Sequence, residues 1–444
     1  MSTNPIATLI AALFRRLGIG EEGSRIGTNF GWLITDRMVR LTLSLVVNVW
    51  LVRYLGVERL GLMSYAQSVV VLMAVFATLG LETILVRDLV RKPEQARELL
   101  GTSLALRLAG SAITLALSLA AVTIMRHGDR DTALLTLIFA TTAFSQSFDV
   151  MEFWFQSRSR LRPLVTARMV GSVISAIAKV AVILLRAPLP VVGVVIASEY
   201  AISTLGLVVA FRTQPDRPSQ WRVQREQALD LLRSAWPLFL TSIAIVISVR
   251  VDQMILTAIH GPHENGLYAA AQRLTEIIYY VPVAVMAAAN PALLRSHQNN
   301  PEEYTRRLQR VFSLLALGGV VIAVCVSLLA PWIIRLLFGA AFAGSAPVLA
   351  IQAWTAPMLF IGVAQSNWFI ANHRQTGLLL RSAVAAALSV GLNFTLIPVL
   401  GARGAAITTL VSQTIGMVAL NACFAETRPL FRMQMRAFLP VPPR

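Results

Sequence analysis

Charged residues are scarce in this sequence. Asp, Glu, Lys and Arg make up 14% of the 444 residues, whereas a soluble domain contains about 25%. A soluble chain of this length needs far more polar surface, so the composition excludes a soluble globular enzyme and a disordered protein. The two cysteines, Cys325 and Cys423, lie in apolar runs, which excludes a disulfide-stabilised scaffold as well.

Sequence patterns of the common catalytic and metal sites are also missing. There is no Walker A motif and no Gly-x-Ser-x-Gly motif. No cysteine or second histidine pair completes a metal site. The histidines lie in expected loops or at helix ends, at His127, His260, His263, His297 and His373. The sequence therefore predicts no catalytic residue, no metal and no cofactor, and a protein that is not an enzyme.

Long apolar runs are abundant instead. Hydrophobic residues make up 56% of the chain, and a helix of about 20 such residues spans a bilayer. The runs lack the strict alternation of a transmembrane barrel. We expect an all-α integral membrane protein with about twelve transmembrane helices, at 29–52, 64–86, 99–124, 132–156, 164–185, 188–211, 235–258, 267–290, 311–334, 348–372, 377–400 and 404–425.

Basic residues are distributed unevenly between the expected loops. With the N-terminus inside, the inner segments carry 24 of the 39 basic residues and the outer loops carry 7. Because basic residues gather in cytoplasmic loops, both termini are expected in the cytoplasm. This distribution also accounts for the net charge of +17 without nucleic-acid binding. The longest outer loop, 335–347, leaves little room for a separate catalytic domain.

The two halves of the chain resemble each other. Five identities recur at one offset of 205 residues, and a Trp-Phe pair recurs at an offset of 214. The matched residues are Gly56/Gly261, Gly61/Gly266, Leu62/Leu267, Ala66/Ala271 and Gln67/Gln272, and then Trp154/Trp368 and Phe155/Phe369. They fall at equivalent places in two sets of six spans. The pattern predicts two parallel six-helix repeats around a central cavity, related by an axis along the membrane normal.

The repeat and the basic loops together predict the domain organisation. We expect a cytoplasmic N-terminal segment at 1–28 and a first six-helix bundle at 29–211. A cytoplasmic linker at 212–234 leads to a second bundle at 235–425, and a cytoplasmic tail follows at 426–444.

The first expected span carries three charges on one side of a helix, Asp36, Arg37 and Arg40. An ionisable group at mid-bilayer costs about 2.5–3.5 kcal/mol, so such groups usually have a function. One interpretation is a structural ion pair between Asp36 and Arg40, which are four residues apart. That pair leaves Arg37 unexplained. We expect all three residues to line a cavity that binds an anion.

Other intramembrane charges are candidates for the same cavity or for ion coupling. Arg107 and Arg273 are expected at the cavity, although Arg273 can also pair with the nearby Glu276. Asp252 and Glu199 are candidate ion-coupling carboxylates. Lys179 is the alternative partner for Glu199.

Three further residues lie near the expected helix ends. Gln365 and Trp368 share a helix face, and an aromatic ring beside an amide suits the C–H faces and hydroxyls of a sugar. Tryptophan is also routine at membrane interfaces, so sugar contact is one of two interpretations. Arg381 is within about a turn of its helix end and is expected to reach the interface as an anchor.

Several stretches resemble a known family. They are 53–61, 65–67, 79–87 and 100–102 in the first half, and 252–256 and 266–276 in the second half, followed by Pro282 and Pro291. They are similar to the polysaccharide (O-antigen-type) flippases of the multidrug/oligosaccharidyl-lipid/polysaccharide exporter superfamily. The resemblance covers most of the chain.

This resemblance implies a transporter of the bacterial inner membrane with a MATE-like fold of two bundles. Such a protein moves an undecaprenyl-pyrophosphate-linked oligosaccharide by alternating access through a cationic cavity, driven by a proton or sodium gradient. The implied partners are the lipid-linked oligosaccharide, membrane lipids and other polysaccharide-assembly proteins. Arginine suits this task because its fork of donors binds phosphate oxygens at any depth.

Three other functions stay open. A multidrug exporter of the same superfamily has mostly cationic substrates, which fit Arg37 and Arg40 poorly. A lipid II-type flippase is favoured by fourteen spans, and we count twelve. An integral-membrane glycan polymerase or ligase usually needs a larger outer loop than this chain has.

Overall fold

The computed structural model describes residues 22–438 except 126–128, 159, 213, 215, 217 and 372–375. Side chains are described from residue 45 onward, apart from 125, 161–162, 218, 287–288, 291, 294, 297–299, 301, 367, 370–371 and 376–379 within helices. The charges expected at Asp36, Arg37 and Arg40, and most of the expected N-terminal segment 1–28, therefore lie outside the described residues.

The described part of the chain is helical throughout. Its first half contains α2 (Glu22–Met73), α3 (Val75–Thr78), α4 (Leu81–Arg91), α5 (Ala96–Met125), α6 (Arg130–Ala140), α7 (Thr142–Ser147), α8 (Val150–Ser157), α9 (Leu161–Leu184) and α10 (Leu189–Phe211). Its second half contains α11 (Arg225–Ile278), α12 (Tyr280–Asn299), α13 (Pro301–Leu337), α14 (Ser345–Ala353), α15 (Thr355–Ala371), α16 (Thr376–Leu400), α17 (Ala402–Thr414), α18 (Leu420–Cys423) and α19 (Arg428–Ala437). A π-helical segment, Ile415–Ala419, joins α17 to α18.

Ten helical segments in the described residues are long and apolar enough to cross a membrane. Two of them, Leu45–Arg91 and Arg225–Met286, contain 47 and 62 residues. A straight helix of 47 residues measures about 70 Å, more than twice the hydrocarbon thickness of about 30 Å. Each of the two folds back at a glycine, so the ten segments give twelve crossings, as the sequence predicts. The protein is an all-α, multi-pass membrane protein.

The two folding points have the same backbone conformation. Gly56 has φ 71° and ψ 177°, and Gly261 has φ 82° and ψ −179°. This left-handed region favours glycine because a side chain there is strained. The recurring Trp-Phe pairs also match, with edge-to-face rings at 5.2 Å and interplanar angles of 86° in the first half and 88° in the second. Two regions far apart in sequence thus have equivalent geometry, which supports the predicted repeat.

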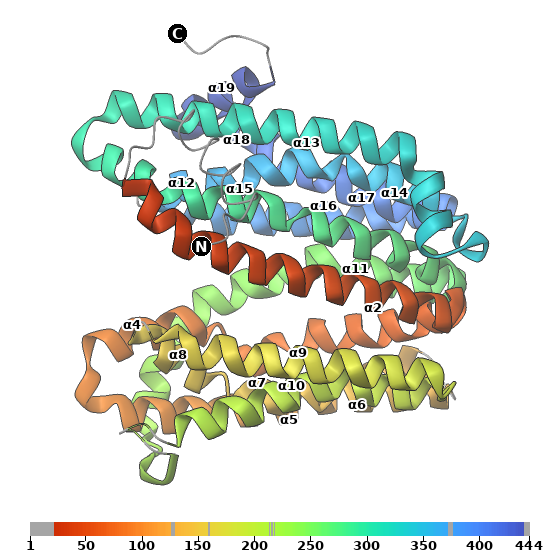
Figure 1. The fold of residues 1–444 in the computed structure, drawn as a ribbon, viewed down its shortest axis with the longest axis horizontal. Coiled ribbons are helices and arrows are strands. Elements are labelled where there is room, and N and C mark those ends of the chain that lie inside the picture. The colour runs from red at the N-terminus through yellow and green to blue at the C-terminus, as the bar shows by residue number, and fades with distance from the viewer. Residues whose placement is uncertain are drawn as a thin grey trace.

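The helices form two groups with α2 and α11 between them (Figure 1). We call the helices up to residue 211 the N-lobe and those of residues 235–423 the C-lobe. The membrane face with Gly56 and Gly261 is the turn end, and the face with residues 212–234 is the linker end. At the turn end one apolar core contains residues of both lobes, among them Leu60 and Leu267. At the linker end one core lies mostly in the N-lobe but includes Ala235 in the first turns of α11, and a second core lies in the C-lobe. The lobes therefore share a core at the turn end, and toward the linker end the first turns of α11 also pack against the N-lobe, where Phe239 contacts Phe76.

Close backbone contact seals the turn end. A Cβ atom on Gly61 would overlap the carbonyl oxygen of Pro262, and one on Gly266 would overlap that of Val57. Asn265 Nδ2 donates to the Gly61 carbonyl oxygen at 2.9 Å. Only glycine permits this approach of the two folding points, so the recurring glycines of the sequence have a packing role at the junction between the lobes.

Candidate functional site

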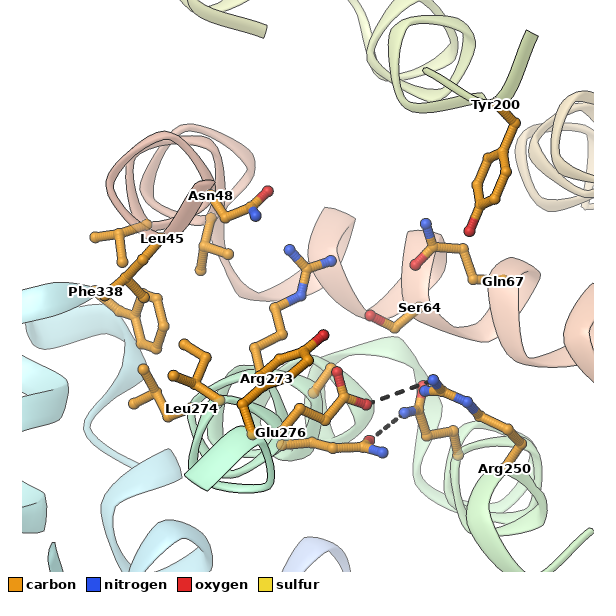
Figure 2. Close-up of a pocket in the computed structure, with 17 residues that line it drawn as sticks. Leu45, Asn48, Ser64, Gln67, Tyr200, Arg250, Arg273, Leu274, Glu276 and Phe338 are labelled. Atoms are coloured by element: carbon orange, nitrogen blue, oxygen red, sulfur yellow. Dashed lines mark hydrogen bonds and ion pairs between the residues drawn. The ribbon is translucent and has the colours of Figure 1, made fainter. Parts of the chain in front are cut away.

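A cavity of about 450 Å³ lies between the lobes, below the sealed turn end. Both halves of α2 and both halves of α11 form its walls, and α10, α12 and the end of α13 complete it (Figure 2). Its lining residues are Leu45, Asn48, Val49, Val52, Ser64, Gln67, Tyr200, Arg250, Gln253, Ala269, Gln272, Arg273, Leu274, Glu276, Ile277, Tyr280 and Phe338. Because both lobes contribute, a relative motion of the lobes would change the cavity.

Three charged side chains line this cavity. Arg250 Nη2 lies 3.4 Å from Glu276 Oε1, which forms an ion pair between the two halves of α11. The guanidinium of Arg273 extends toward α2, and no described residue forms an ion pair or hydrogen bond with it (Figure 2). The described lining carries a net charge of +1, and Arg273 is its available cation. Such a group can bind an anion without first breaking an ion pair.

Amides and hydroxyls surround this cation. Gln253 accepts a hydrogen bond from Ser68 Oγ of the N-lobe at 2.9 Å and donates to Gln272. Gln67 and Tyr200 face the cavity from the N-lobe (Figure 2). Such groups suit a ligand rich in hydroxyls.

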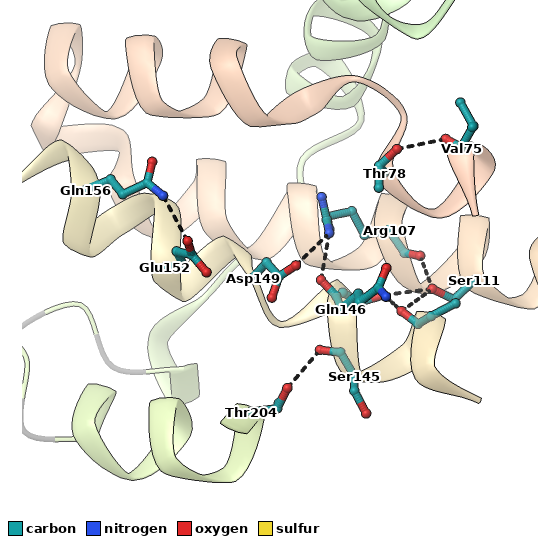
Figure 3. Close-up of polar contacts among 12 residues, drawn as sticks. Val75, Thr78, Arg107, Ser111, Ser145, Gln146, Asp149, Glu152, Gln156 and Thr204 are labelled. Carbon is teal, nitrogen blue, oxygen red and sulfur yellow. Dashed lines mark hydrogen bonds and ion pairs between the residues drawn. The ribbon is translucent and has the colours of Figure 1, made fainter. Parts of the chain in front are cut away.

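Arg273 is the one residue of the predicted cavity set that the described structure places at the cavity. Arg107 instead lies inside the N-lobe, with a side chain that is 2% exposed. Its Nη2 donates to the carbonyl oxygen of Gln146 at 2.6 Å and lies 3.5 Å from Asp149 (Figure 3). Its guanidinium also stacks over Phe153 at 5.5 Å. These contacts connect α5 with α7 and α8, which is a structural role.

The predicted ion-coupling carboxylates lie in separate lobes. Glu199 accepts hydrogen bonds from Lys179 at 2.9 Å and from Ser175 at 2.8 Å, so Lys179 is its partner. Asp252 is buried in the C-lobe, where it accepts from the Tyr268 hydroxyl and from the Gln253 backbone N–H at 2.7 Å. Neither carboxylate is among the described residues that line the cavity.

The predicted sugar-contact residues lie at the linker end of the C-lobe. Gln365 is 4% exposed, and its amide lies 2.8 Å from the Asn421 amide and 2.6 Å from the Gln434 amide. Trp368 packs edge-to-face on Phe369. Neither lines the described cavity, so their contacts belong to the lobe interior.

The anchor role expected for Arg381 is wrong. Its side chain is 5% exposed, stacks over Phe369 at 4.2 Å and lies 2.9 Å from the Gln365 amide. An equivalent contact in the N-lobe, offset by 213 residues, joins Arg168 to Glu152. The physical reason is that Phe369 offers an aromatic face and Gln365 offers an amide inside the bundle, so the guanidinium of Arg381 has partners there and does not reach water.

Sequence reasoning missed most of the polar lining, including Asn48, Gln67, Tyr200 and Tyr280. One feature could have found part of it. Gln67 and Gln272 are the polar members of the five identities at the offset of 205, and both line the cavity. Where two repeats surround a common axis, an identical polar residue at equivalent positions indicates that both side chains face that axis.

Comparison with known families supports this architecture. Residues 26–297, more than half of the chain, match the family described as "Polysaccharide biosynthesis protein". The chain belongs to this family. A search of curated proteins gives no match.

Solved structures with the same fold are transporters and flippases. "Lipid II flippase MurJ, inward closed conformation" has a TM-score of 0.72 and 16% identity, and the match covers 92% of this chain and 90% of that one. An inward-facing multidrug resistance MATE family transporter of the MOP superfamily has a TM-score of 0.71 and 16% identity, with coverage of 90% and 96%. An outward-facing structure of such a transporter has a TM-score of 0.61 and 15% identity, with coverage of 90% and 94%. The chain therefore shares its fold with these transporters and flippases.

Proposed function

We propose that the protein moves undecaprenyl-pyrophosphate-linked oligosaccharide repeat units across the bacterial inner membrane, for the assembly of surface polysaccharide. The observation that carries this proposal is the unpaired guanidinium of Arg273 in a cavity between the lobes. A pyrophosphate cannot cross hydrocarbon without a counter-charge. Arginine offers two parallel N–H donors to phosphate oxygens, which gives both charge and geometry.

The polar lining suits the rest of the headgroup. Gln67, Gln272 and Tyr200 provide donors and acceptors for sugar hydroxyls. We assign sugar contact to these residues in place of Gln365 and Trp368. The polyprenyl chain stays in the lipid, beside a headgroup held between the lobes.

The arrangement of the lobes supports transport by alternating access. One apolar core joins the lobes at the turn end, whereas at the linker end most of the C-lobe helices have a core of their own. The higher TM-score for the inward-facing than for the outward-facing neighbour agrees with an inward-facing state. Basic residues are in excess in the linker-side segments, so the linker end and both termini are proposed to lie in the cytoplasm.

An ion-coupled multidrug exporter is the second candidate, because such transporters share the fold. The cavity argues against it, since an unpaired guanidinium repels a cationic drug. A proton or sodium gradient is the proposed driving force, with Glu199 and Asp252 as the carboxylates. Other polysaccharide-assembly proteins are proposed partners that would supply and consume the substrate.

Binding of undecaprenyl pyrophosphate to the purified protein tests the proposal. Arg273→Ala is expected to weaken binding about 10- to 100-fold, the range for hydrogen bonds to a charged group. Arg273→Lys is expected to recover part of the affinity, because a point charge lacks the bidentate geometry. The control is Arg335→Ala, which removes an exposed arginine outside the cavity lining. Equal affinity of the Arg273→Ala and Arg335→Ala variants would refute the assignment.

A further inference from the structure

The C-terminal helix α19 is fixed beside the membrane surface. α18 ends at Cys423 and α19 begins at Arg428. The intervening residues can span at most about 18 Å, so α19 cannot move far from the last membrane crossing. Its buried residues Leu430 and Ala437 belong to the linker-end core of the C-lobe. Gln309 of α13 donates to the Met433 carbonyl oxygen at 3.0 Å.

The first turns of α13 indicate the depth of this contact relative to the bilayer. α13 contains 37 residues and is about 55 Å long, so it extends well beyond the hydrocarbon core. Gln309, which hydrogen-bonds to α19, lies just before the expected span 311–334. The helix α19 therefore lies at the level of the lipid headgroups.

The opposite face of α19 is a ridge of three arginines. Arg428, Arg432 and Arg436 are four residues apart, and all three are exposed. The sequence of α19 contains no acidic residue. Within the described part of the chain, no carboxylate forms an ion pair with any of the three. Two more exposed arginines, Arg306 and Arg310, lie on the adjoining turns of α13.

Apolar side chains border this ridge. Met435 and Phe438 are each 37% exposed, although both are large and hydrophobic. A helix with cations and apolar groups on its outer side suits the boundary between headgroups and acyl chains. The guanidiniums then meet the lipid phosphates, and the apolar groups enter the acyl region.

We propose that the outer face of α19 is a docking surface for anionic phospholipid headgroups of the leaflet at the linker end. The charge and depth of the ridge match lipid phosphates, and each guanidinium can form two hydrogen bonds to one phosphate. Because α19 packs on α13, bound lipid holds this part of the C-lobe at the membrane surface. The proposal is independent of what the cavity carries.

The test uses full-length protein and two matched variants. The first changes Arg428, Arg432 and Arg436 to Gln. The control changes Arg59, Arg130 and Arg403, exposed arginines near the turn-end loops, to Gln. Both lose three positive charges, and both keep the buried face of α19. Affinities for phosphatidylglycerol and phosphatidylcholine are measured by native mass spectrometry of the detergent-solubilised proteins.

The wild type and the control are expected to prefer phosphatidylglycerol, and the α19 variant is expected to lose about 100-fold in affinity for it. This follows from about fivefold for each arginine near an anionic surface. Should the triple variant not fold, Arg432→Gln alone is expected to show the fivefold loss. An α19 variant within twofold of the control would overturn the proposal. So would an equal loss of phosphatidylcholine binding, or full displacement of the lipid by inorganic phosphate at equal concentration.

Discussion

Glu276 forms its ion pair with Arg250 of the preceding helical segment, at 3.4 Å, and not with Arg273 on its own helix. Arg273 and Glu276 are three residues apart, so a pair between them is also sterically possible. Because Glu276 pairs with Arg250, the guanidinium of Arg273 stays available in the cavity. The charge offered to a ligand therefore depends on how two arginines share one carboxylate.

Removing this carboxylate is expected to strengthen anion binding. Glu276→Gln raises the net charge of the described lining by one, which stabilises a bound pyrophosphate by about 1 kcal/mol, the scale for unit charges about 4 Å apart in water. Arg250→Gln is expected to weaken binding, because Glu276 then turns to Arg273. The double variant is expected near wild type. Binding of undecaprenyl pyrophosphate measures all three, and weaker binding by Glu276→Gln would contradict the shared-carboxylate account.

Enlarging a glycine at the turn end is expected to separate the lobes. Gly61→Val places a side chain against the backbone of Pro262. Gly318→Val is the matched control, because a Cβ atom there meets nothing within 4 Å. Spin labels on Glu58→Cys and His263→Cys measure the distance between the lobes. We expect a longer distance in Gly61→Val alone, and an unchanged distance would show that this contact does not hold the lobes together.

Substitution of Arg107 is expected to lower the stability of the protein, and substitution of Arg273 is not. Arg107→Ala leaves Asp149 without its nearest cation and removes the link from α5 to α7, so we expect a loss of roughly 3 kcal/mol of stability. Arg273→Ala removes no described ion pair and is expected to keep thermal stability. Thermal unfolding in detergent compares the two variants. Similar unfolding temperatures for both would argue against the structural role of Arg107.

Ion coupling is expected to depend on a carboxylate at Asp252 or Glu199. Amide substitution at a coupling residue should abolish gradient-driven transport in vesicles and leave substrate binding intact. Glu199→Gln also removes the partner of Lys179, so its stability must be measured alongside. Full gradient-driven transport by both Asp252→Asn and Glu199→Gln would exclude carboxylate coupling at these positions.

The fold could be predicted because its determinants are local. Apolar runs of bilayer length specify the crossings, and the recurring Gly56 and Gly261 mark the same turn in each half. The residues that line the cavity were harder to predict, because whether a side chain faces the cavity depends on how its helix is rotated about its own axis in the bundle. Arg107 and Arg273 are both arginines within expected membrane spans, yet one lies inside a lobe and the other lies between the lobes.

The contact partners of each arginine were also difficult to predict from the sequence. Arg381 lies near a helix end, which suggests an interfacial anchor, but Phe369 and Gln365 satisfy it inside the bundle. Such contacts join different helices and leave no spacing pattern in the sequence. The predicted roles of Arg37 and Arg40 stay predictions, since their side chains lie outside the described residues.

Transport through the Arg273 cavity can be measured by translocation in reconstituted vesicles. A fluorescent undecaprenyl-pyrophosphate-linked oligosaccharide is placed in one leaflet, and its arrival in the other is followed by an impermeant quencher. We predict transfer with the wild type and with Arg335→Ala, and at least a tenfold slower transfer with Arg273→Ala, in line with the lost charged hydrogen bonds. Equal transfer by Arg273→Ala and the wild type would contradict the account.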